Sequence, residues 1–129
     1  MKTVLITGAA KRIGAFLAEY LHDQGFNIII HYHQSEQEAQ TLCKQLLQNR
    51  PKSAHLIHVD LHDPQAHQLI MAQVQHYTPQ LDVLVNNASA FSKSDQDFDE
   101  MFQINVKLPY LLSRAAYPLL KKSQGLIVN

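Results

Sequence analysis

Short runs of consecutive apolar residues alternate along this chain with longer segments whose apolar residues recur every three or four positions. The wholly apolar runs are residues 4–6, 28–30, 83–85 and 126–128, and residues 55–59 add a fifth run that contains two histidines. Apolar runs without polar alternation are typical of strands whose two faces are both covered, as in a parallel sheet. The pattern therefore predicts five buried strands.

Four segments with helical spacing separate these strands and carry start and stop signals. They begin near residues 13, 36, 63 and 97 and end near residues 21, 48, 76 and 122. Ser35 and the pair Asp63–Pro64 are residue types that begin helices, and Gly25 stands where the C-cap of a helix belongs. We expect one helix between each pair of consecutive strands.

Strands that alternate with helices predict a parallel sheet joined by right-handed βαβ crossovers. The 129 residues hold five strands and four helices with no repeat or linker, so we expect one nucleotide-binding domain over residues 1–129. The predicted fold class is α/β, a Rossmann-type doubly wound parallel sheet of five strands with helices on both faces. We expect it to be truncated after the fifth strand.

Composition and charge argue against several classes of partner. Eleven Lys and Arg balance eleven Asp and Glu, so net charge favours neither nucleic acid nor an anionic membrane. No apolar run approaches the roughly 18 residues of a membrane span, and Lys11 and Arg12 interrupt the apolar start too early for a targeting signal. The single cysteine, Cys43, is typical of a reducing compartment. We expect a cytoplasmic protein that binds neither nucleic acid nor membrane.

The first predicted strand runs into a glycine turn that opens a helix. The segment reads Thr7-Gly8-Ala9-Ala10-Lys11-Arg12-Ile13-Gly14. A tight turn at a helix N-terminus directs backbone N–H groups and the positive end of the helix dipole at an anion. Gly8 allows the turn, and Gly14 lets the helix pack closely on the strand. This context favours a dinucleotide phosphate site over an ordinary strand-to-helix loop.

The end of the second predicted strand discriminates between the two nicotinamide cofactors. An acid about 20 residues beyond the glycine turn would accept a ribose 2′-hydroxyl, but residues 31–35 contain no acid. His33, Gln34 and Ser35 stand there instead, and all are hydrogen-bond donors, as are Lys11 and Arg12. Such a set suits a 2′-phosphate, so we predict NADP(H) rather than NAD(H).

Three motifs together resemble the short-chain dehydrogenase/reductase family. They are Thr7-Gly8-x-x-x-Arg12-x-Gly14, His31-Tyr32-His33-x-Ser35 and Asn86-Asn87-Ala88-Ser89-x-Phe91. Arg12 replaces the middle glycine that is usual in the family, and the set is most similar to the pteridine reductase branch. The resemblance covers the whole chain. It implies an oligomeric, NADPH-dependent oxidoreductase that reduces a small molecule, in the first place a dihydropterin to a tetrahydropterin.

The resemblance also implies roles for the matched residues. Arg12 would contact both the pyrophosphate and the pterin edge, Ser89 would lie on the substrate side, and Phe91 would stack on the pterin ring. The implied cofactor contacts are Gly8, Lys11, Arg12, Ile13, Gly14, His33, Gln34, Ser35, Asp60, Leu61, Asn87, Ala88 and Ser89. Within this set, Asp60 and Leu61 would flank the adenine. The branch often has Arg at the position of Gln34, which implies weaker NADP(H) binding here.

Asn105 matches the asparagine of the family's catalytic tetrad. Pro109 has no N–H group, so it cannot bond the carbonyl oxygen of Asn105 four residues earlier in a helix. That carbonyl is therefore available to hold a water or a lysine in a proton relay. The alternative interpretation is a simple kink that fits the helix to the sheet.

The sequence leaves the activity and the assembly open. The resemblance implies that a Tyr-x-x-x-Lys beyond the fifth strand protonates the substrate. The one such pattern in these residues, Tyr117 to Lys121, comes before that strand, so we expect these residues alone to be inactive. The alternatives to a pterin reductase are a related carbonyl or enoyl reductase and a non-catalytic nucleotide-binding fragment. The eight histidines show no zinc spacing, and we expect no metal site. Excess apolar residues between 97 and 122 predict a homo-oligomer.

Overall fold

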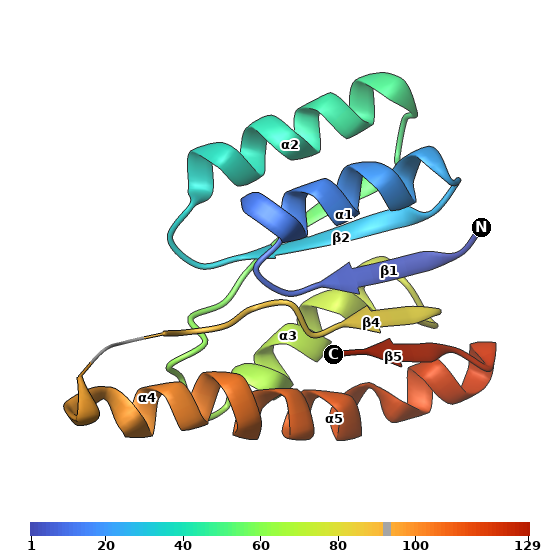
Figure 1. Cartoon of the computed structure of the whole chain (residues 1–129). Coiled ribbons are helices and arrows are strands. Elements are labelled where there is room, and N and C mark those ends of the chain that lie inside the picture. Colours follow the sequence, from blue (N-terminus) through green and yellow to red (C-terminus); the bar gives the residue numbers. More distant parts are fainter. Residues whose placement is uncertain (92–93) are drawn as a thin grey trace.

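A computed structural model describes residues 1–91 and 94–129 of the chain. Five strands form one sheet in the order β3-β2-β1-β4-β5, with every neighbouring pair parallel (Figure 1). The strands are β1 (Thr3–Ile6), β2 (Asn27–Tyr32), β3 (Ala54–His58), β4 (Val83–Val85) and β5 (Leu126–Val128). Strand order reverses direction at β1, which confirms the predicted doubly wound sheet.

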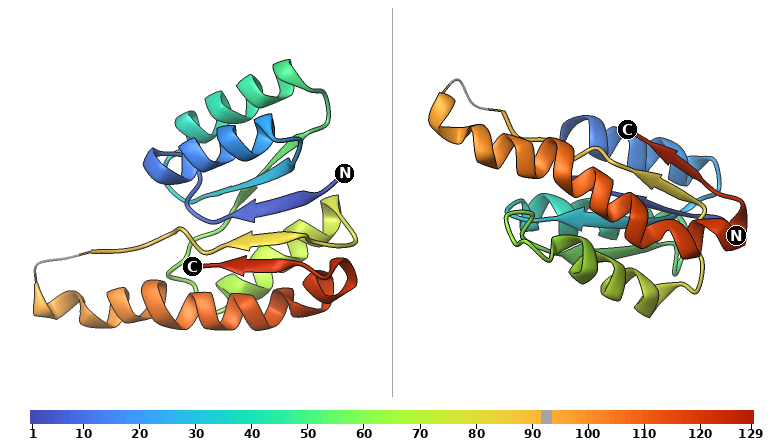
Figure 2. Two further views of the ribbon diagram at one scale, coloured as in Figure 1. Left: turned by 45° about the vertical axis from the view of Figure 1, so that its right-hand side comes forward. Right: turned by 90° about the horizontal axis from the view of Figure 1, so that it is seen from below.

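Helices connect the strands and cover both faces of the sheet (Figure 2). They are α1 (Arg12–Asp23), α2 (Glu36–Asn49), α3 (Ala66–Tyr77), the 3-10 helix η1 (Asp95–Asp97), α4 (Phe98–Phe102), the π-helix η2 (Gln103–Lys107) and α5 (Leu108–Ser123). One core lies under α1 and α2, and the other lies under α3 and α5. No helix among the described residues is long and apolar enough to cross a membrane.

Consecutive residues of the central strands face opposite cores. Val4 and Ile6 of β1 belong to the core under α1 and α2, whereas Leu5 belongs to the core under α3 and α5. All three side chains are fully buried. A strand covered on both faces gains from an apolar side chain at every position, which explains the unbroken apolar runs in the sequence.

The predicted helix signals have mixed outcomes. Gly25 has φ +98° and donates its N–H to the carbonyl of His22 at 2.9 Å, which confirms the expected end of α1. The helix expected to start at Asp63–Pro64 begins instead at Ala66. Asp63 Oδ1 accepts the N–H of Gln65 at 2.8 Å, so this side chain closes a local turn. The prediction was wrong because aspartate bonds its own backbone in turns as readily as it caps a helix.

The predicted helix over residues 97–122 is confirmed, but it contains a π-helical turn that was not predicted from the sequence. Leu108 donates its N–H to the carbonyl of Gln103, five residues earlier. Pro109 follows at the start of α5, where its missing N–H costs little. The wider turn lets α4 and α5 run on as one curved rod beneath the sheet (Figure 1).

One buried polar side chain, His31, joins the ends of three strands. Its Nδ1 accepts the N–H of Gly8 at 3.0 Å, and its Nε2 donates to the carbonyl of Val59 at 2.9 Å. These partners place the only ring proton on Nε2, because an N–H can only donate and a carbonyl can only accept. Burial lowers the pKa of His31 to about 4, which keeps the ring neutral at physiological pH.

This burial makes the stability of the fold depend on pH. The unfolded chain takes up the proton near the ordinary pKa of 6.5, whereas the folded ring takes it up only near a pKa of about 4. The contribution of His31 is therefore complete above about pH 6.5 and is lost as the pH falls toward 4, by up to about 3 kcal/mol. The variant His31→Gln should lack this component.

Urea unfolding from about pH 7 to about pH 4.5 measures the effect. The free energy of unfolding should fall more steeply with acidification in the wild type than in His31→Gln. Ile30→Val, which loses one methylene from the same strand at a cost of about 1 kcal/mol, should keep the wild-type slope. Burial also lowers the pKa of His22, but this residue is present in all three proteins, so it adds the same pH dependence to the free energy of unfolding of each. Parallel slopes for the wild type and His31→Gln would contradict this account.

Candidate functional site

The turn after β1 is built around two glycines that cannot carry side chains. Gly8 has φ +61°, and a Cβ there would lie 3.1 Å from Cα of Ala88. A Cβ on Gly14 would lie 2.5 Å from the carbonyl oxygen of Gly8 and 2.6 Å from Nδ2 of Asn87. Glycine is therefore required at residue 14 by the close contact with the turn and the loop after β4, and it is favoured at residue 8 by the positive φ.

Hydrogen bonds fix the loop after β4 to this turn. Nδ2 of Asn87 donates to the carbonyl of Thr7 at 3.1 Å and to that of Gly8 at 3.0 Å. Oγ1 of Thr7 accepts the N–H of Asn87 at 3.1 Å and of Ala88 at 3.0 Å. The amide of Asn87 is thus occupied by the protein, so its side chain holds the turn and its backbone lines the site.

The start of α1 combines backbone donors with exposed basic side chains. The first N–H groups of a helix have no acceptor within the helix, and α1 starts beside the carboxyl end of β1 (Figure 1), so an anion can bind at this helix end. Arg12 has φ +55°, the left-handed conformation that side chains other than glycine rarely adopt. Lys11 Nζ lies 3.8 Å from Glu38 Oε1 in an exposed ion pair, which contributes little stability and exchanges easily.

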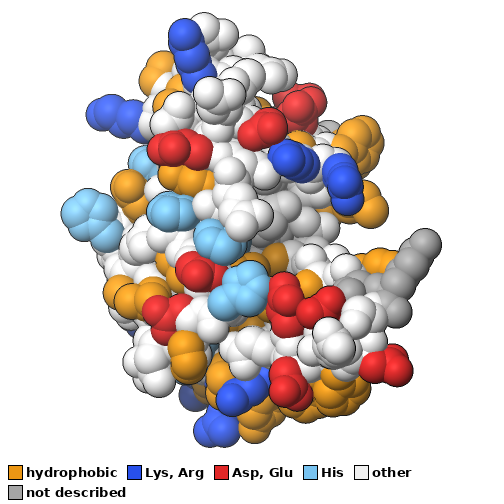
Figure 3. Space-filling view, turned by 90° about the vertical axis from the view of Figure 1, so that its left-hand side faces the viewer, with side chains coloured by type: hydrophobic (Ala, Val, Ile, Leu, Met, Phe, Trp, Pro, Cys, Tyr) orange, Lys and Arg blue, Asp and Glu red, His pale blue; other side chains and the backbone are white. Residues whose placement is uncertain are grey.

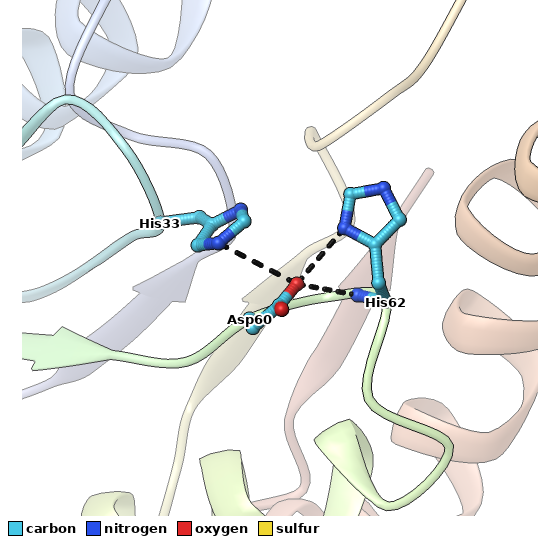
Figure 4. A group of neighbouring side chains, drawn as sticks. All are labelled: His33, Asp60 and His62. Carbon is cyan, nitrogen blue, oxygen red and sulfur yellow. Dashed lines mark hydrogen bonds and ion pairs between the residues drawn. The ribbon is translucent and has the colours of Figure 1, made fainter.

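Three polar side chains meet where β2 and β3 end (Figure 4). Nε2 of His33 lies 3.5 Å from Oδ1 of Asp60. The same oxygen accepts the backbone N–H of His62 at 2.8 Å and faces Nδ1 of His62 at 2.9 Å. The bonds from His62 lower the pKa of Asp60, while the carboxylates of Glu100 and Asp60 raise the pKa of His62.

The residues assigned to the adenosine half of a cofactor differ in how exposed their side chains are. Gln34 is exposed and Ser35 is half-buried at the start of α2. The side chain of Leu61 is buried in the core under α3, so only its backbone can flank an adenine. Viewed from the carboxyl ends of the strands, histidine and acidic side chains gather on one face (Figure 3).

Several polar residues around this group were not predicted from the sequence. Nε2 of His58 donates to the carbonyl of His33 at 2.9 Å, and its ring stacks on Tyr32 with centroids 4.9 Å apart. Glu100, from α4, contacts Nε2 of His62 at 2.9 Å. These contacts depend on the register of β2 against β3 and on the path of a distant helix. The only signal in the sequence was the number of histidines at and just after the second and third strands.

A cleft of about 590 Å³ opens at the carboxyl ends of β4 and β5. Its walls come from the loop after β4, from η2 and α5, and from the end of the chain. The lining residues are Asn86, Asn87, Ala88, Ser89, Asn105, Val106, Pro109, Tyr110, Ser113 and Asn129. Four residues from the sequence-predicted site, including Asn105, therefore line one cavity, while Asn86, Tyr110 and Ser113 were not predicted.

Asn105 fixes one wall of the cleft by a paired contact. Its Oδ1 accepts the N–H of Ala90 at 2.8 Å, and its Nδ2 donates to the carbonyl of Ala90 at 2.7 Å. The amide thereby holds the segment that leads to Phe91, whose side chain is 84% exposed. An exposed ring on a fixed segment is available to stack on a planar ligand.

The chain matches the family model described as short chain dehydrogenase over residues 2–129. It is 37% identical to pteridine reductase 1 of Leishmania tarentolae over 105 residues, which cover 67% of this chain and 36% of that protein. It is 28% identical to versicolorin reductase 1 of Aspergillus parasiticus over 134 residues, which cover 99% of this chain and 51% of that protein. The chain spans about half the length, or less, of these curated relatives.

A solved structure agrees with both the fold and the family. FolM alternative dihydrofolate reductase 1 from Brucella suis, in complex with NADP, superposes with a TM-score of 0.87 at 30% identity. The match covers 99% of this chain and 56% of that one. The family match over residues 2–129 and the parallel sheet lead to one conclusion: the chain belongs to the short-chain dehydrogenase family.

Proposed function

We propose that residues 1–129 form the NADP(H)-binding domain of a cytoplasmic, NADPH-dependent reductase that acts on a pterin. One observation carries the cofactor assignment: the end of β2 presents His33, Gln34 and Ser35 where an NAD-specific site would have an acid. The pyrophosphate would lie at the start of α1, between the glycine turn and Arg12. The 2′-phosphate would lie against the three donors after β2.

An acid that lies beside His33, Asp60, does not argue for NAD(H). Asp60 follows β3 rather than β2, and its Oδ1 already accepts a hydrogen bond from the backbone of His62. Its negative charge, together with that of Glu100, raises the pKa of the His62 ring beside it. Asp60 is therefore suited to flank an adenine, as the family resemblance implies, while His33 faces the 2′-phosphate.

The nicotinamide and the substrate would occupy the cleft beside β4 and β5. The bound cofactor supplies the hydride, and the protein must orient the acceptor beside it. Ala88 and Ser89 would line the nicotinamide, Phe91 would stack on the substrate, and the guanidinium of Arg12 would contact the substrate edge. A flat heteroaromatic substrate suits an exposed aromatic ring. Relatives named pteridine reductase and alternative dihydrofolate reductase favour a pterin.

Asn105 is the residue of these 129 that we assign to catalysis. Its side chain holds Ala90, and Pro109 has no N–H to offer its carbonyl, so that oxygen would hold a water in a proton relay. The family resemblance places the catalytic tyrosine and lysine beyond β5, whereas the one Tyr-x-x-x-Lys here, Tyr117 to Lys121, lies before β5 in α5. We therefore assign binding and positioning to these residues, without turnover by themselves.

A second candidate activity rests on a different relative. Versicolorin reductase 1 matches across 99% of this chain, so reduction of another carbonyl or an enoyl substrate is the alternative to a pterin. A non-catalytic nucleotide-binding role is the further alternative. A pterin that quenches or shifts the fluorescence of bound NADPH at micromolar concentration would favour the first activity.

We also propose that the chain self-associates through the exposed face of the rod formed by α4, η2 and α5. Large apolar side chains recur there at helical spacing and are about half exposed or more. They are Phe98, Phe102, Val106, Tyr110 and Tyr117. An apolar stripe that faces water lowers the solubility of the protein. Covering it with a second copy would stabilise the assembly by roughly 25 cal/mol for each Å² of apolar surface that is buried.

The cofactor assignment predicts a preference for NADPH that His33 controls. The variant His33→Asp should bind NADPH about tenfold or more weakly, because a carboxylate repels the 2′-phosphate, and should bind NADH no worse than the wild type. Titration of the chain with each nucleotide, followed by nucleotide fluorescence, measures both constants. His76→Asp makes the same change at an exposed position on α3 and should bind both nucleotides with the affinity of the wild type. Equal affinity of the wild type for NADH and NADPH would refute the assignment.

The left-handed conformation of Arg12 predicts that replacing this residue by glycine increases stability and weakens cofactor binding. Arg12→Gly should raise the free energy of unfolding by about 1 kcal/mol, because glycine tolerates φ +55°. It should also weaken NADPH binding about tenfold through loss of a charged contact. Lys52→Gly, at φ +61° on the turn before β3, is the control that should gain stability and keep affinity. Wild-type affinity in Arg12→Gly would contradict the assignment.

Self-association predicts a mass above that of the 14.7 kDa chain at micromolar concentration. Light scattering after size exclusion should give a dimer or a larger closed assembly for the wild type. Phe102→Glu should shift the population toward the monomer, because it places a charge within the apolar stripe. Gln75→Glu, on exposed α3, should not. A wild-type monomer would disprove the proposed interface.

A further inference from the structure

Three groups that are common metal ligands converge at the ends of β2 and β3. Each of His33, Asp60 and His62 offers one ligand atom, and these atoms lie within 4.8 Å of one another (Figure 4). The contacts to Oδ1 of Asp60 measure 3.5 Å from Nε2 of His33 and 2.9 Å from Nδ1 of His62. Ligand atoms around tetrahedral zinc lie roughly 3.4 Å apart. Small side-chain movements would therefore close this triangle around an ion.

The ring of His62 is held in the orientation that a metal ligand needs. Its Nε2 lies 2.9 Å from Oε1 of Glu100, on the side opposite Asp60. When Nδ1 binds an ion, the remaining proton on Nε2 can donate to this carboxylate. Such carboxylate–histidine pairs orient the ring and make the ligating nitrogen a stronger base.

The other two ligands are also anchored by the protein. The backbone N–H of His62 donates to Asp60 at 2.8 Å, which directs the carboxylate toward the group. Nε2 of His58 donates to the carbonyl of His33 at 2.9 Å, which holds the strand end that carries the third ligand. All three ligand side chains are partly exposed, between 28% and 53%, so an ion can enter from solvent.

We propose that His33, Asp60 and His62 bind one divalent ion of the zinc class, with Glu100 orienting His62. Imidazole and carboxylate are ligands of zinc, and three protein ligands leave a coordination position for water. The charge of the ion would be balanced by Asp60 and by the nearby Glu100. The ligand set was invisible in the sequence because its members come from two strand ends separated by a helix.

The site has a consequence that rests on the proposed function. His33 and Asp60 are also the residues assigned to the adenosine half of NADPH. A side chain that ligates an ion is withdrawn from the nucleotide, so the ion and NADPH would exclude each other. Free zinc would then lower the affinity of the domain for its cofactor.

Calorimetric titration of the 129-residue chain with Zn²⁺ tests the site itself. We expect one ion per chain in the wild type. Affinity should fall about tenfold or more in His62→Ala and His33→Ala, and about tenfold in Glu100→Gln. His76→Ala removes an exposed histidine outside the group and should bind as the wild type. Circular dichroism of each variant checks the fold, and Glu100→Gln leaves all three ligands in place.

The outcomes separate a built site from scattered surface binding. Binding that is equally tight in the wild type, His62→Ala and Glu100→Gln would overturn the proposal, because it would assign the zinc to other histidines. The absence of binding by the folded wild type would overturn it as well. Loss confined to the three variants of the group would support it.

NADPH titration with and without zinc tests mutual exclusion. At zinc ten times its own dissociation constant, the apparent dissociation constant for NADPH should rise about tenfold in the wild type. His62→Ala, which leaves the assigned cofactor residues intact, should bind NADPH normally and should lose most of the zinc effect. Any zinc effect that remains in this variant measures how much the binding of zinc to the nucleotide phosphates in solution reduces free NADPH. Zinc binding with unchanged NADPH affinity would refute the exclusion and the placement of the adenosine, but not the metal site.

Discussion

The close approach of the glycine turn to the loop after β4 is the constraint on which the rest of the site depends. Gly8 has φ +61° and lies tightly against Ala88, and Gly14 lies against Gly8 and Asn87 at distances that exclude a Cβ atom. Asn87 then uses this proximity to bond the carbonyls of Thr7 and Gly8. A side chain at either glycine would separate α1 from β4, and the anion-directed helix start would move away from the cleft.

A buried histidine completes this arrangement from β2, the strand on the other side of β1 from β4. His31 receives the N–H of Gly8 and donates to Val59, so the turn after β1 is tied to the ends of β2 and β3. The neutral ring performs this function because burial keeps its pKa at about 4. The phosphate turn is thus supported from both neighbouring strands before any ligand binds, which reduces the ordering cost of binding.

The sequence predicted the parts of the molecule that depend on local chemistry. The apolar runs placed every strand, and the motifs around Gly8 and Asn87 identified the family. Contacts between distant strands were not predictable, because the register that places His58 against Tyr32 follows from packing and not from spacing. For the same reason His31 was a polar residue after three isoleucines with no assigned partner, and Asp63 was mistaken for a helix cap. The grouping of His33, Asp60 and His62 likewise required the folded sheet.

The carboxyl edge of the sheet is proposed to bind NADP(H) in a defined orientation. A crystal structure of the chain grown with NADPH tests this orientation most directly. We predict the pyrophosphate at the start of α1, the 2′-phosphate within hydrogen-bond distance of His33 and Ser35, and the nicotinamide in the cleft beside Asn105. A nucleotide bound in the reverse orientation, or a 2′-phosphate that faces solvent away from His33, would contradict the account.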